Sequence, residues 1–305
     1  MRCKKCQSDA IIELKQHNVA FCKEHYDTFF KSRVQKAIKE FNLFKNKSRI
    51  LIAISGGKDS LALWDVLFKL GYETRGVIID LGIKGYSDSS VELSKKFADK
   101  NNLNLQVIKL EDEIDGFNIP KIAKIVKRPN CSVCGIIKRY LLNKYAYENN
   151  FNVICTGHNL DDEAALLFGN ILNWKLDYLE RQFPKLEKDI KKLVDKVKPL
   201  IYLTDREVAV YNISNEIDYI DYDCPLSKGA SSSKYKHVLS TLEEIMRGSK
   251  HKLLFDFYRN KSNLFPDKQE LIINNKKCNI CGYPTTQEVC NYCNIKKNVL
   301  DSKGD

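Results

Sequence analysis

Short apolar runs alternate along the chain with segments in which apolar residues recur every three or four positions. Such runs are typical of buried strands, and the spaced segments are typical of helices that bury one face. The pattern predicts strands at residues 50–54, 74–80, 103–110 and 151–156. It predicts helices at residues 61–70, 87–100, 204–217 and 238–246, with another starting near residue 26 and one near residue 158. Strands that alternate with helices favour an α/β fold with a parallel sheet covered on both faces.

Local signals set the expected helix boundaries. Gly71 is expected to follow the end of the helix at 61–70. Ser87 or Asp88 is expected to cap the helix at 87–100, and Thr204 and Glu207 read as a capping box. The helix that starts near residue 26 should fix the preceding segment to the main domain through one apolar stripe. That stripe comprises Phe30, Val34, Ala37, Phe41 and Phe44.

The composition fits a globular protein with a polyanionic partner. A chain of 305 residues can form one large domain with appendages or two domains. Its 50 Lys and Arg against 39 Asp and Glu give a net charge of +11, which favours nucleic acid as partner. The mixed-charge run at 184–198 is expected to be a solvated helix face rather than a contact for that partner. No apolar run is as long as a membrane span and no apolar signal segment opens the chain, so we expect a cytoplasmic protein without a membrane partner.

The sequence SGGKDS at 55–60 lies between a predicted strand and a predicted helix. Backbone N–H groups and the positive end of the helix face one small space in such a turn, which suits a phosphate. A Walker A loop would need glycine where Ile52 stands, so this is another kind of phosphate loop, or an ordinary turn capped by Asp59 or Ser60. The turn at 156–159 follows another strand, at the edge where parallel sheets bind ligands.

Cysteine pairs separated by two residues indicate metal binding in a chain without an export signal. Two sets fit tetrahedral Zn²⁺. The first comprises Cys3, Cys6, Cys22 and His25, and the second comprises Cys278, Cys281, Cys290 and Cys293. We therefore predict two zinc modules. The C-terminal one could be purely structural or could also grip RNA.

Four cysteines remain. Cys155 lies among apolar neighbours and is expected to be a small buried hydrophobe. Cys131, Cys134 and Cys224 are three thiolates without a fourth, which suits a cluster or metal with one open position. An iron without a cysteine ligand could bind an exogenous sulfur atom. The alternatives are a redox pair of Cys131 and Cys134, or a persulfide on Cys224.

Charged residues surround this cysteine pair in the sequence. Lys138 shares a helix face with Cys131 and Cys134 if a helix starts near Cys131. It could meet a phosphate or a developing negative charge, or it could be an ordinary surface lysine. Four basic residues just upstream could dock a nucleic-acid backbone. They are Lys121, Lys124, Lys127 and Arg128.

Three acidic residues at 161–163 fall in the first turn of the helix predicted near residue 158. The helix macrodipole stabilises acidic residues there, which is sufficient reason for their presence. A functional role would require a carboxylate near ATP that holds Mg²⁺ or orients the acceptor.

Together these motifs resemble the TtuA group of tRNA thiolation enzymes in the ATP-pyrophosphatase superfamily. The resemblance covers nearly the whole chain and runs through CxxC…CxxH, SGGKDS, PxCxxCGxxKR, TGHNLDDEAA, a lone cysteine and a double CxxC. The group is a branch of the TtcA family, which includes the archaeal and eukaryotic wobble-uridine thiolases, and TtcA proper lacks the zinc modules. The resemblance implies a PP-loop core between two zinc modules. We expect a zinc finger at 1–32, a catalytic domain at 33–270 and a zinc knuckle at 271–305.

The resemblance also implies the site residues and cofactors. Cys131, Cys134 and Cys224 match the ligands of a [4Fe-4S] cluster with one open iron. Asp59, Lys138 and Asp162 match residues considered catalytic. The positions that match the surroundings of ATP are Ala53, Ser55, Gly56, Gly57, Asp59, Ser60, Ile79, Lys138, Gly157 and Asp162. Two Zn²⁺ and Mg²⁺ complete the expected cofactors. The chain departs from many members after Cys224, where Pro225-Leu226-Ser227 replaces a tyrosine-serine-proline stretch, so the resemblance implies no acceptor contacts at these positions.

The implied reaction converts a tRNA uridine to 2-thiouridine. ATP adenylates the C2 oxygen while SGGKDS holds pyrophosphate, and sulfur then passes from the cluster to C2. The acceptor base must be unstacked to be reached. We expect the T-loop uridine as acceptor, with the wobble uridine as the alternative, and a homodimer as the working form. The sulfur donor could be a ubiquitin-like carrier, a persulfide or free sulfide, and the sequence does not distinguish these three. Two alternative functions belong to other classes of protein: a zinc-module tRNA-binding protein without catalysis, and an amidating ligase.

Overall fold

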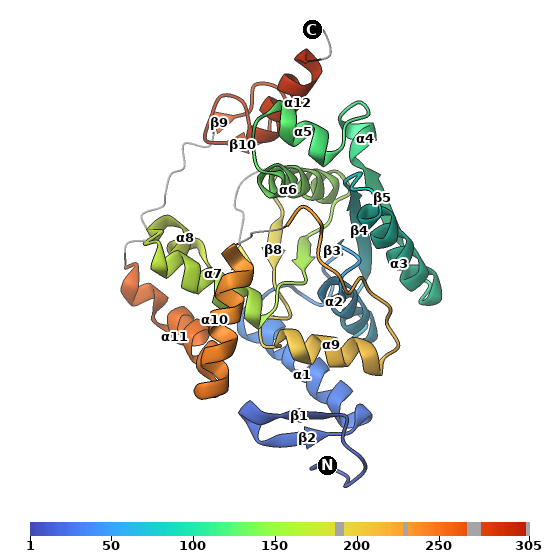
Figure 1. Ribbon diagram of the computed structural model, residues 1–305, viewed down its shortest axis with the longest axis vertical. Coiled ribbons are helices and arrows are strands. Elements are labelled where there is room, and N and C mark those ends of the chain that lie inside the picture. The colour runs from blue at the N-terminus through green and yellow to red at the C-terminus, as the bar shows by residue number, and fades with distance from the viewer. Residues whose placement is uncertain (187–191, 228–230, 267–275, 303–305) are drawn as a thin grey trace.

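The computed structural model describes residues 1–186, 192–227, 231–266 and 276–302. Its centre is a six-stranded sheet with strand order β5-β4-β3-β6-β8-β7 (Figure 1). All neighbouring strands run parallel except β7, which pairs antiparallel with β8 at one edge. The strands are β3 (Ile50–Ile54), β4 (Thr74–Asp80), β5 (Leu105–Lys109), β6 (Val153–Thr156), β7 (Lys185–Leu186) and β8 (Asp195–Val197). The predicted α/β class with a mainly parallel sheet is confirmed.

Helices cover both faces of this sheet. Along β3, Ile50, Ile52 and Ile54 belong to one apolar core and Leu51 belongs to the other, as the two-residue period of a strand requires. The helices are α1 (Lys23–Glu40), α2 (Lys58–Lys69), α3 (Tyr86–Lys100), α4 (Leu110–Glu113), α5 (Ile119–Ile125), α6 (Asn130–Glu148), α7 (Leu160–Leu172), α8 (Leu176–Arg181), α9 (Asp205–Ser214), α10 (Ser231–Ile245), α11 (Ser249–Leu264) and α12 (Asn291–Asp301).

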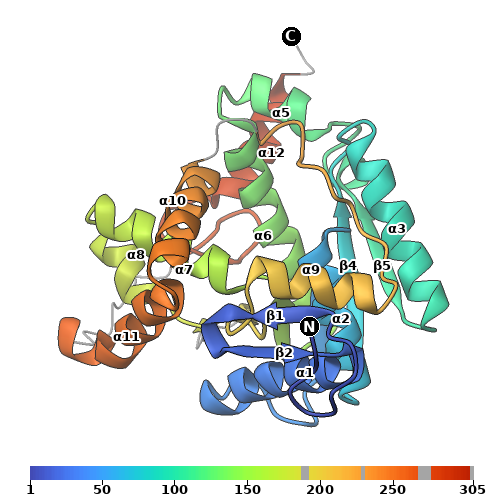
Figure 2. The same cartoon turned by 60° about the horizontal axis from the view of Figure 1, so that its bottom comes forward.

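Two small hairpins lie outside the sheet. Strands β1 (Ile12–Leu14) and β2 (Val19–Phe21) form the first, and β9 (Lys276–Lys277) and β10 (Pro284–Thr285) form the second. Figure 2 shows the first hairpin beside α1 and α9. Helix α1 packs on α9, because the Tyr26 hydroxyl donates to the Glu207 carbonyl at 2.5 Å and the Phe30 ring stacks on Tyr211 at 3.9 Å. The stripe on α1 thus joins the first hairpin to the main core.

Several predicted boundaries need correction. Helix α1 ends at Glu40, so Phe41 and Phe44 lie beyond it, although both still pack on the core. Asn42 takes a left-handed φ of 45°, which ends the helix. Helix α3 is capped by Gly85 rather than by Ser87 or Asp88. The Asp88 carboxylate instead accepts the Gly85 N–H at 3.2 Å, from the third helical position.

The largest correction concerns the mixed-charge run at 184–198. Its described ends form strands β7 and β8 rather than a helix, while residues 187–191 lie outside the described residues. Val194 and Val197 are buried on either side of two half-buried charged residues. Their burial in the sheet favours a strand, although the charged composition of the run had favoured a solvated helix. The predicted domain boundary at 270–271 also lies outside the described residues.

Five other boundaries shift by smaller amounts. Strands β5 and β6 each start two residues later than predicted, and β5 also ends one residue earlier. Helix α9 ends at Ser214, three residues before its predicted end. Helix α10 begins at Ser231, seven residues before its predicted start. The capping box of Thr204 and Glu207 at the start of α9 is confirmed.

Candidate active site and metal centres

The SGGKDS turn joins β3 to α2 with its main chain closely packed. Gly56 has a φ of +76°, and a Cβ there would lie 2.8 Å from the Ser90 main chain, so no other residue fits without a shift. The Ser60 hydroxyl donates to the Gly57 carbonyl at 3.0 Å and accepts the Ser55 N–H at 3.1 Å. Gly157 of the second turn packs on the same loop, because a Cβ there would lie 2.8 Å from the Asp59 main chain. The two glycine turns that the sequence singled out therefore meet at one edge of the sheet.

Charged groups from four segments meet beside this loop. The Lys58 ammonium lies 2.8 Å from the Asp59 carboxylate and 2.7 Å from that of Asp205. Lys236 of α10 reaches Asp162 at 2.6 Å and Asp205 at 3.0 Å. The Asn159 amide donates to both Asp59 (2.9 Å) and Asp205 (2.8 Å). Asp59 and Asp162, both predicted site residues, are thus joined through Asp205, which the sequence reasoning did not single out.

The protonation states follow from burial and from these neighbours. Burial raises the pKa of Asp59, although the Lys58 ammonium acts in the opposite direction. Burial also opposes ionisation of Asp205, but Lys58 and Lys236 outweigh it and hold that pKa at about 2. For Lys236, the carboxylates of Asp162 and Asp205 outweigh burial and raise its pKa. Two ammonium groups are therefore held beside a loop suited to phosphate.

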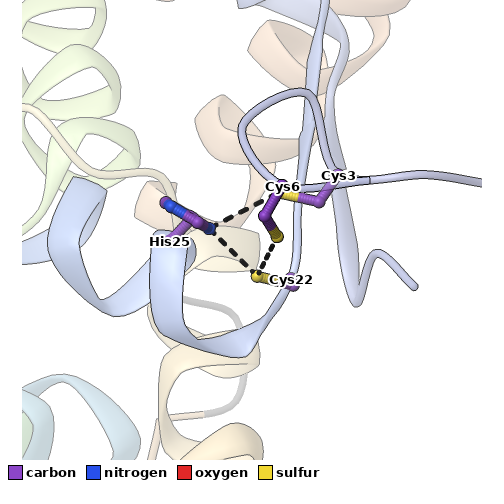
Figure 3. A group of neighbouring side chains, drawn as sticks. All are labelled: Cys3, Cys6, Cys22 and His25. Carbon is purple, nitrogen blue, oxygen red and sulfur yellow. Dashed lines mark hydrogen bonds between the residues drawn. The ribbon is translucent and has the colours of Figure 1, made fainter. Parts of the chain in front are cut away.

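The cysteine set near the N-terminus converges on one point (Figure 3). The ligand atoms of Cys3, Cys6, Cys22 and His25 all lie within 4.8 Å of one another. Cys22 caps α1 and His25 lies in its first turn, with 3.2 Å between Sγ and Nδ1. Three thiols and one imidazole at this spacing could hold a tetrahedral zinc ion.

The second cysteine set converges in the same way. The sulfur atoms of Cys278, Cys281, Cys290 and Cys293 lie within 4.8 Å of one another. Backbone N–H groups support them, because Cys278 Sγ accepts from the N–H of Cys290 at 3.3 Å and Cys290 Sγ accepts from that of Cys293 at 3.4 Å. Such N–H donors stabilise thiolates, so this set could also hold a zinc ion.

The three remaining thiols of interest lie around the start of α6. Cys131 and Cys134 occupy its first turns, so a helix does start near Cys131. Burial raises the pKa of the Cys134 thiol, with the Lys138 ammonium opposing this rise and Cys224 and Cys131 adding to it. Cys131 Sγ donates to the Leu226 carbonyl at 3.5 Å, two residues past Cys224. Among the described residues, Cys131, Cys134 and Cys224 are not one of the sets whose ligand atoms all lie within 4.8 Å of one another, so they do not form a closed site like the two terminal sets.

Comparison with known protein families accounts for the N-terminal module and for the domain that carries the phosphate loop. The family profile of the PP-loop domain matches residues 26–223. The profile of the N-terminal LIM domain of 2-thiouridine synthetase TtuA matches residues 2–27. The tRNA-5-methyluridine(54) 2-sulfurtransferase of Thermotoga maritima is 42% identical over 99% of this chain and 98% of its own length. This chain belongs to the PP-loop tRNA 2-sulfurtransferase family.

Two further relatives agree with this family. The tRNA-5-methyluridine(54) 2-sulfurtransferase of Thermus thermophilus is 42% identical over 97% of this chain and 91% of its own length. The U34-tRNA thiolase NcsA of Methanococcus maripaludis, solved with its [4Fe-4S] cluster, superposes with a TM-score of 0.81 at 27% identity. That match covers 98% of this chain and 96% of the thiolase chain. As a member of this sulfurtransferase family the chain is an enzyme, which excludes the ligase and non-catalytic readings.

The sequence singles out the phosphate loop and the cysteine sets but not all of the charged network beside the loop. Asp205 follows a capping threonine and Lys236 lies inside a helix, so nothing in the sequence marks either residue. Cys155 is fully buried as expected, and burial raises the pKa of its thiol. Within the part of the chain that the structure describes, no helix is both long and apolar enough to cross a membrane.

Each acidic residue in the first turn of α7 pairs with a lysine from a different segment. Lys250 of α11 contacts Asp161, and Lys198 contacts Glu163 at 2.7 Å, with all four side chains nearly buried. Lys236 contacts Asp162, whose side chain is more exposed. Asp161 and Glu163 thus tie α7 to α11 and to the residue after β8, whereas Asp162 pairs with Lys236 beside the phosphate loop.

Replacement of Lys250 by methionine is expected to lower the free energy of unfolding by about 3–5 kcal/mol, because it leaves the Asp161 carboxylate buried without its cation. The matched control is Lys252→Met on the same helix, whose side chain is 82% exposed and pairs with Asp256 at the surface. It should change the free energy by about 0.5 kcal/mol or less. Urea denaturation of both variants measures the difference, and equal shifts would contradict a structural role for Lys250.

Proposed function

We propose that this chain transfers sulfur to C2 of the 5-methyluridine at position 54 in the tRNA T-loop. One observation carries the proposal. The segment after α9 joins the phosphate loop to the cysteines, because the Ile220 N–H donates to the Gly56 carbonyl at 2.9 Å and Leu226 accepts from Cys131. Adenylation of the C2 oxygen and attack of sulfur on C2 involve neighbouring atoms of one base, so this proximity suits the reaction. The names and identities of the two bacterial relatives support position 54.

The phosphate loop would bind ATP and hold the leaving pyrophosphate. Main-chain N–H groups at the start of α2 and the ammonium groups of Lys58 and Lys236 would stabilise its charge. The C2 oxygen attacks the α-phosphorus, pyrophosphate leaves, and an adenylated base results. Sulfur then replaces that oxygen at C2, and AMP departs. A carbonyl oxygen is a poor leaving group, so this prior adenylation makes the substitution possible.

We propose Asp59, Lys138 and Asp162 as the residues that act on the reacting groups. Asp59 and Asp162 are carboxylates suited to hold the Mg²⁺ that accompanies ATP, once phosphate oxygens compete for Lys58 and Lys236. Lys138 lies on α6, one turn past Cys134, and would stabilise charge on the α-phosphate. The remaining proposed contacts of ATP are Ala53, Ser55, Gly56, Gly57, Ser60, Ile79 and Gly157.

We propose Cys131, Cys134 and Cys224 as the ligands of a [4Fe-4S] cluster. When bound, the cluster would supply an iron position able to hold the incoming sulfur. The donor of that sulfur is proposed to be a small carrier, a persulfide or sulfide. Zinc in the two terminal modules would be structural, since each set of four ligands leaves no open position.

Position-mapped nucleoside mass spectrometry tests this function. tRNA from a strain that lacks the gene is compared with tRNA from the same strain complemented by the wild-type chain or by Lys138→Ala. We expect 2-thiolation at position 54 to be absent from the deletion strain and to return when the wild-type chain is supplied. With Lys138→Ala it should stay below about 1% of the wild-type level. Persistence of every thiolated base in the deletion strain, with no second enzyme present, would exclude the proposal.

The wobble uridine is the second candidate acceptor. The similarity in fold to a U34-tRNA thiolase favours it, but that relative is only 27% identical. Loss of 2-thiouridine at position 34 rather than 54 in the same experiment would select this candidate and keep the chemistry.

We further propose a cytoplasmic homodimer with domains at 1–32, 33–270 and 271–305. Free thiols in metal-type pairs support a reducing compartment. Large apolar side chains exposed on and near α7 and α8, namely Leu172, Trp174, Leu176 and Tyr178, support an interface with a second copy. Light scattering of the purified chain tests the dimer.

A further inference from the structure

An exposed aromatic side chain lies in the segment that joins the phosphate loop to the cysteines. This segment, residues 217–227, runs from the end of α9 toward α6 before the chain enters α10 (Figure 1). Ile220 pairs with Gly57 of the phosphate loop, and Cys224 follows four residues later. Tyr222 lies halfway between them and is 51% exposed. Its position along the segment is therefore between the two sites that the reaction must bring together.

The ring of Tyr222 is held on one side and open on the other. It meets the ring of Tyr86 edge to face, with 6.0 Å between centroids and 77° between planes. Its hydroxyl donates to the Gly85 carbonyl at 3.4 Å. Tyr86 in turn packs against the same apolar core as Cys134 and Cys224. These contacts fix an aromatic ring beside the cysteines while leaving about half of the side chain accessible to a ligand.

The acceptor base requires such a surface. It must leave its stack in the tRNA to reach the enzyme, which costs stacking energy. Proteins that bind unstacked RNA bases commonly replace that stack with an aromatic side chain. C2 of the base must be reachable from the phosphate loop and from the cysteines, and Tyr222 is the exposed aromatic residue of the segment that touches both.

We propose that Tyr222 stacks on the unstacked acceptor pyrimidine and positions its C2 between the phosphate loop and the cysteines. This inference rests on the proposed function and adds the residue that recognises the base. Tyr222 is a binding residue and takes no part in proton or sulfur transfer.

The test measures the dissociation constant of tRNA and the rate of thiolation for the holoenzyme. Tyr222→Ala removes the ring and should weaken tRNA binding about 10-fold, within the range for loss of one base–aromatic stack. Tyr222→Phe keeps the ring but loses the hydrogen bond to Gly85, and should stay within about 2-fold of wild type. Phe68→Ala is the matched control, since this ring is 42% exposed and lies at the opposite end of α2 from the phosphate loop, and the variant should bind tRNA as wild type does.

A second substrate separates stacking from a purely structural role. A tRNA with dihydrouridine at the acceptor position carries a saturated, non-planar base that stacks poorly. Wild type should bind it about 10-fold more weakly than normal tRNA, whereas Tyr222→Ala should bind both tRNAs equally. The inference would be overturned if dihydrouridine weakened tRNA binding equally for wild type and Tyr222→Ala. It would also be overturned if Tyr222→Phe bound normal tRNA as weakly as Tyr222→Ala.

The outcome is distinguishable from failure of the proposed function. If the wild-type enzyme thiolates position 54 while Tyr222→Ala binds and thiolates like wild type, only the inference about Tyr222 fails. If the wild-type enzyme forms no 2-thiouridine at position 54 or 34, the proposed function itself fails.

Discussion

Replacement of Cys134 by serine is expected to reduce formation of 2-thiouridine by at least about 100-fold while ATP still binds within about 2-fold of wild type. Loss of a residue that only supports a metal ligand costs 10- to 100-fold, so loss of a ligand should cost no less. Binding of ATP should persist because the phosphate loop is built from β3 and α2, whereas Cys134 lies on α6. Nucleoside mass spectrometry measures the first quantity and calorimetry with ATP measures the second.

Serine variants of the three cysteines distinguish the three roles that the sequence left open for them: cluster ligands, a redox pair and a persulfide. A cluster predicts equal losses for Cys131→Ser, Cys134→Ser and Cys224→Ser, accompanied by loss of iron. A redox pair predicts that Cys224→Ser stays active, and a persulfide predicts that only Cys224→Ser fails. Cys155→Ala is the control, because this thiol is fully buried in β6 and lies in neither of the two converged cysteine sets found among the described residues. It should keep its iron and thiolate normally.

The core of the fold and the phosphate loop could be predicted because their signals are local. The apolar run at β3, the two glycines after it and the spaced apolar residues of α2 follow one another directly in the chain. The two cysteine sets near the ends of the chain could be singled out for the same reason, since the members of each pair are separated by two residues, and the structure brings each set together. Helix α6 then brings Cys131 and Lys138 onto one element, as their spacing indicated.

The remainder depends on contacts between distant segments. Lys58 pairs with Asp205 across 147 positions in the sequence, and Lys236 pairs with Asp162 from another helix. A charged residue in a helix usually faces solvent, so its sequence context does not reveal a buried partner. Strands β7 and β8 were missed similarly, because Val194 and Val197 pack on the sheet while charged neighbours dominate the composition. Tyr222 is informative only because Ile220 pairs with the phosphate loop.

The C-terminal cysteine set connects metal binding to the candidate active site through α6. Tyr292, between Cys290 and Cys293, stacks on Tyr140 of α6 with 3.8 Å between ring centroids and 8° between planes. The same apolar core contains both the cysteine set and the buried face of α6. A zinc ion in this set should therefore help to fix the helix that carries Cys131, Cys134 and Lys138.

Replacement of Cys281 by serine is expected to lower the zinc content from two ions per chain to one and to expose α12. Cys281 is only half-buried, so the change acts mainly through the metal, and zinc binding contributes about 10–16 kcal/mol in isolated zinc-finger peptides. Hydrogen exchange should rise in α12 and in the first turns of α6. Thiolation should fall as well, because α6 carries Cys131, Cys134 and Lys138. Cys6→Ser, at an exposed ligand of the other set, should also remove one zinc but raise exchange in residues 1–25 while α12 stays protected. Two zinc ions retained by Cys281→Ser would contradict the assignment, and an unchanged α6 would show that the C-terminal module folds independently of the active site.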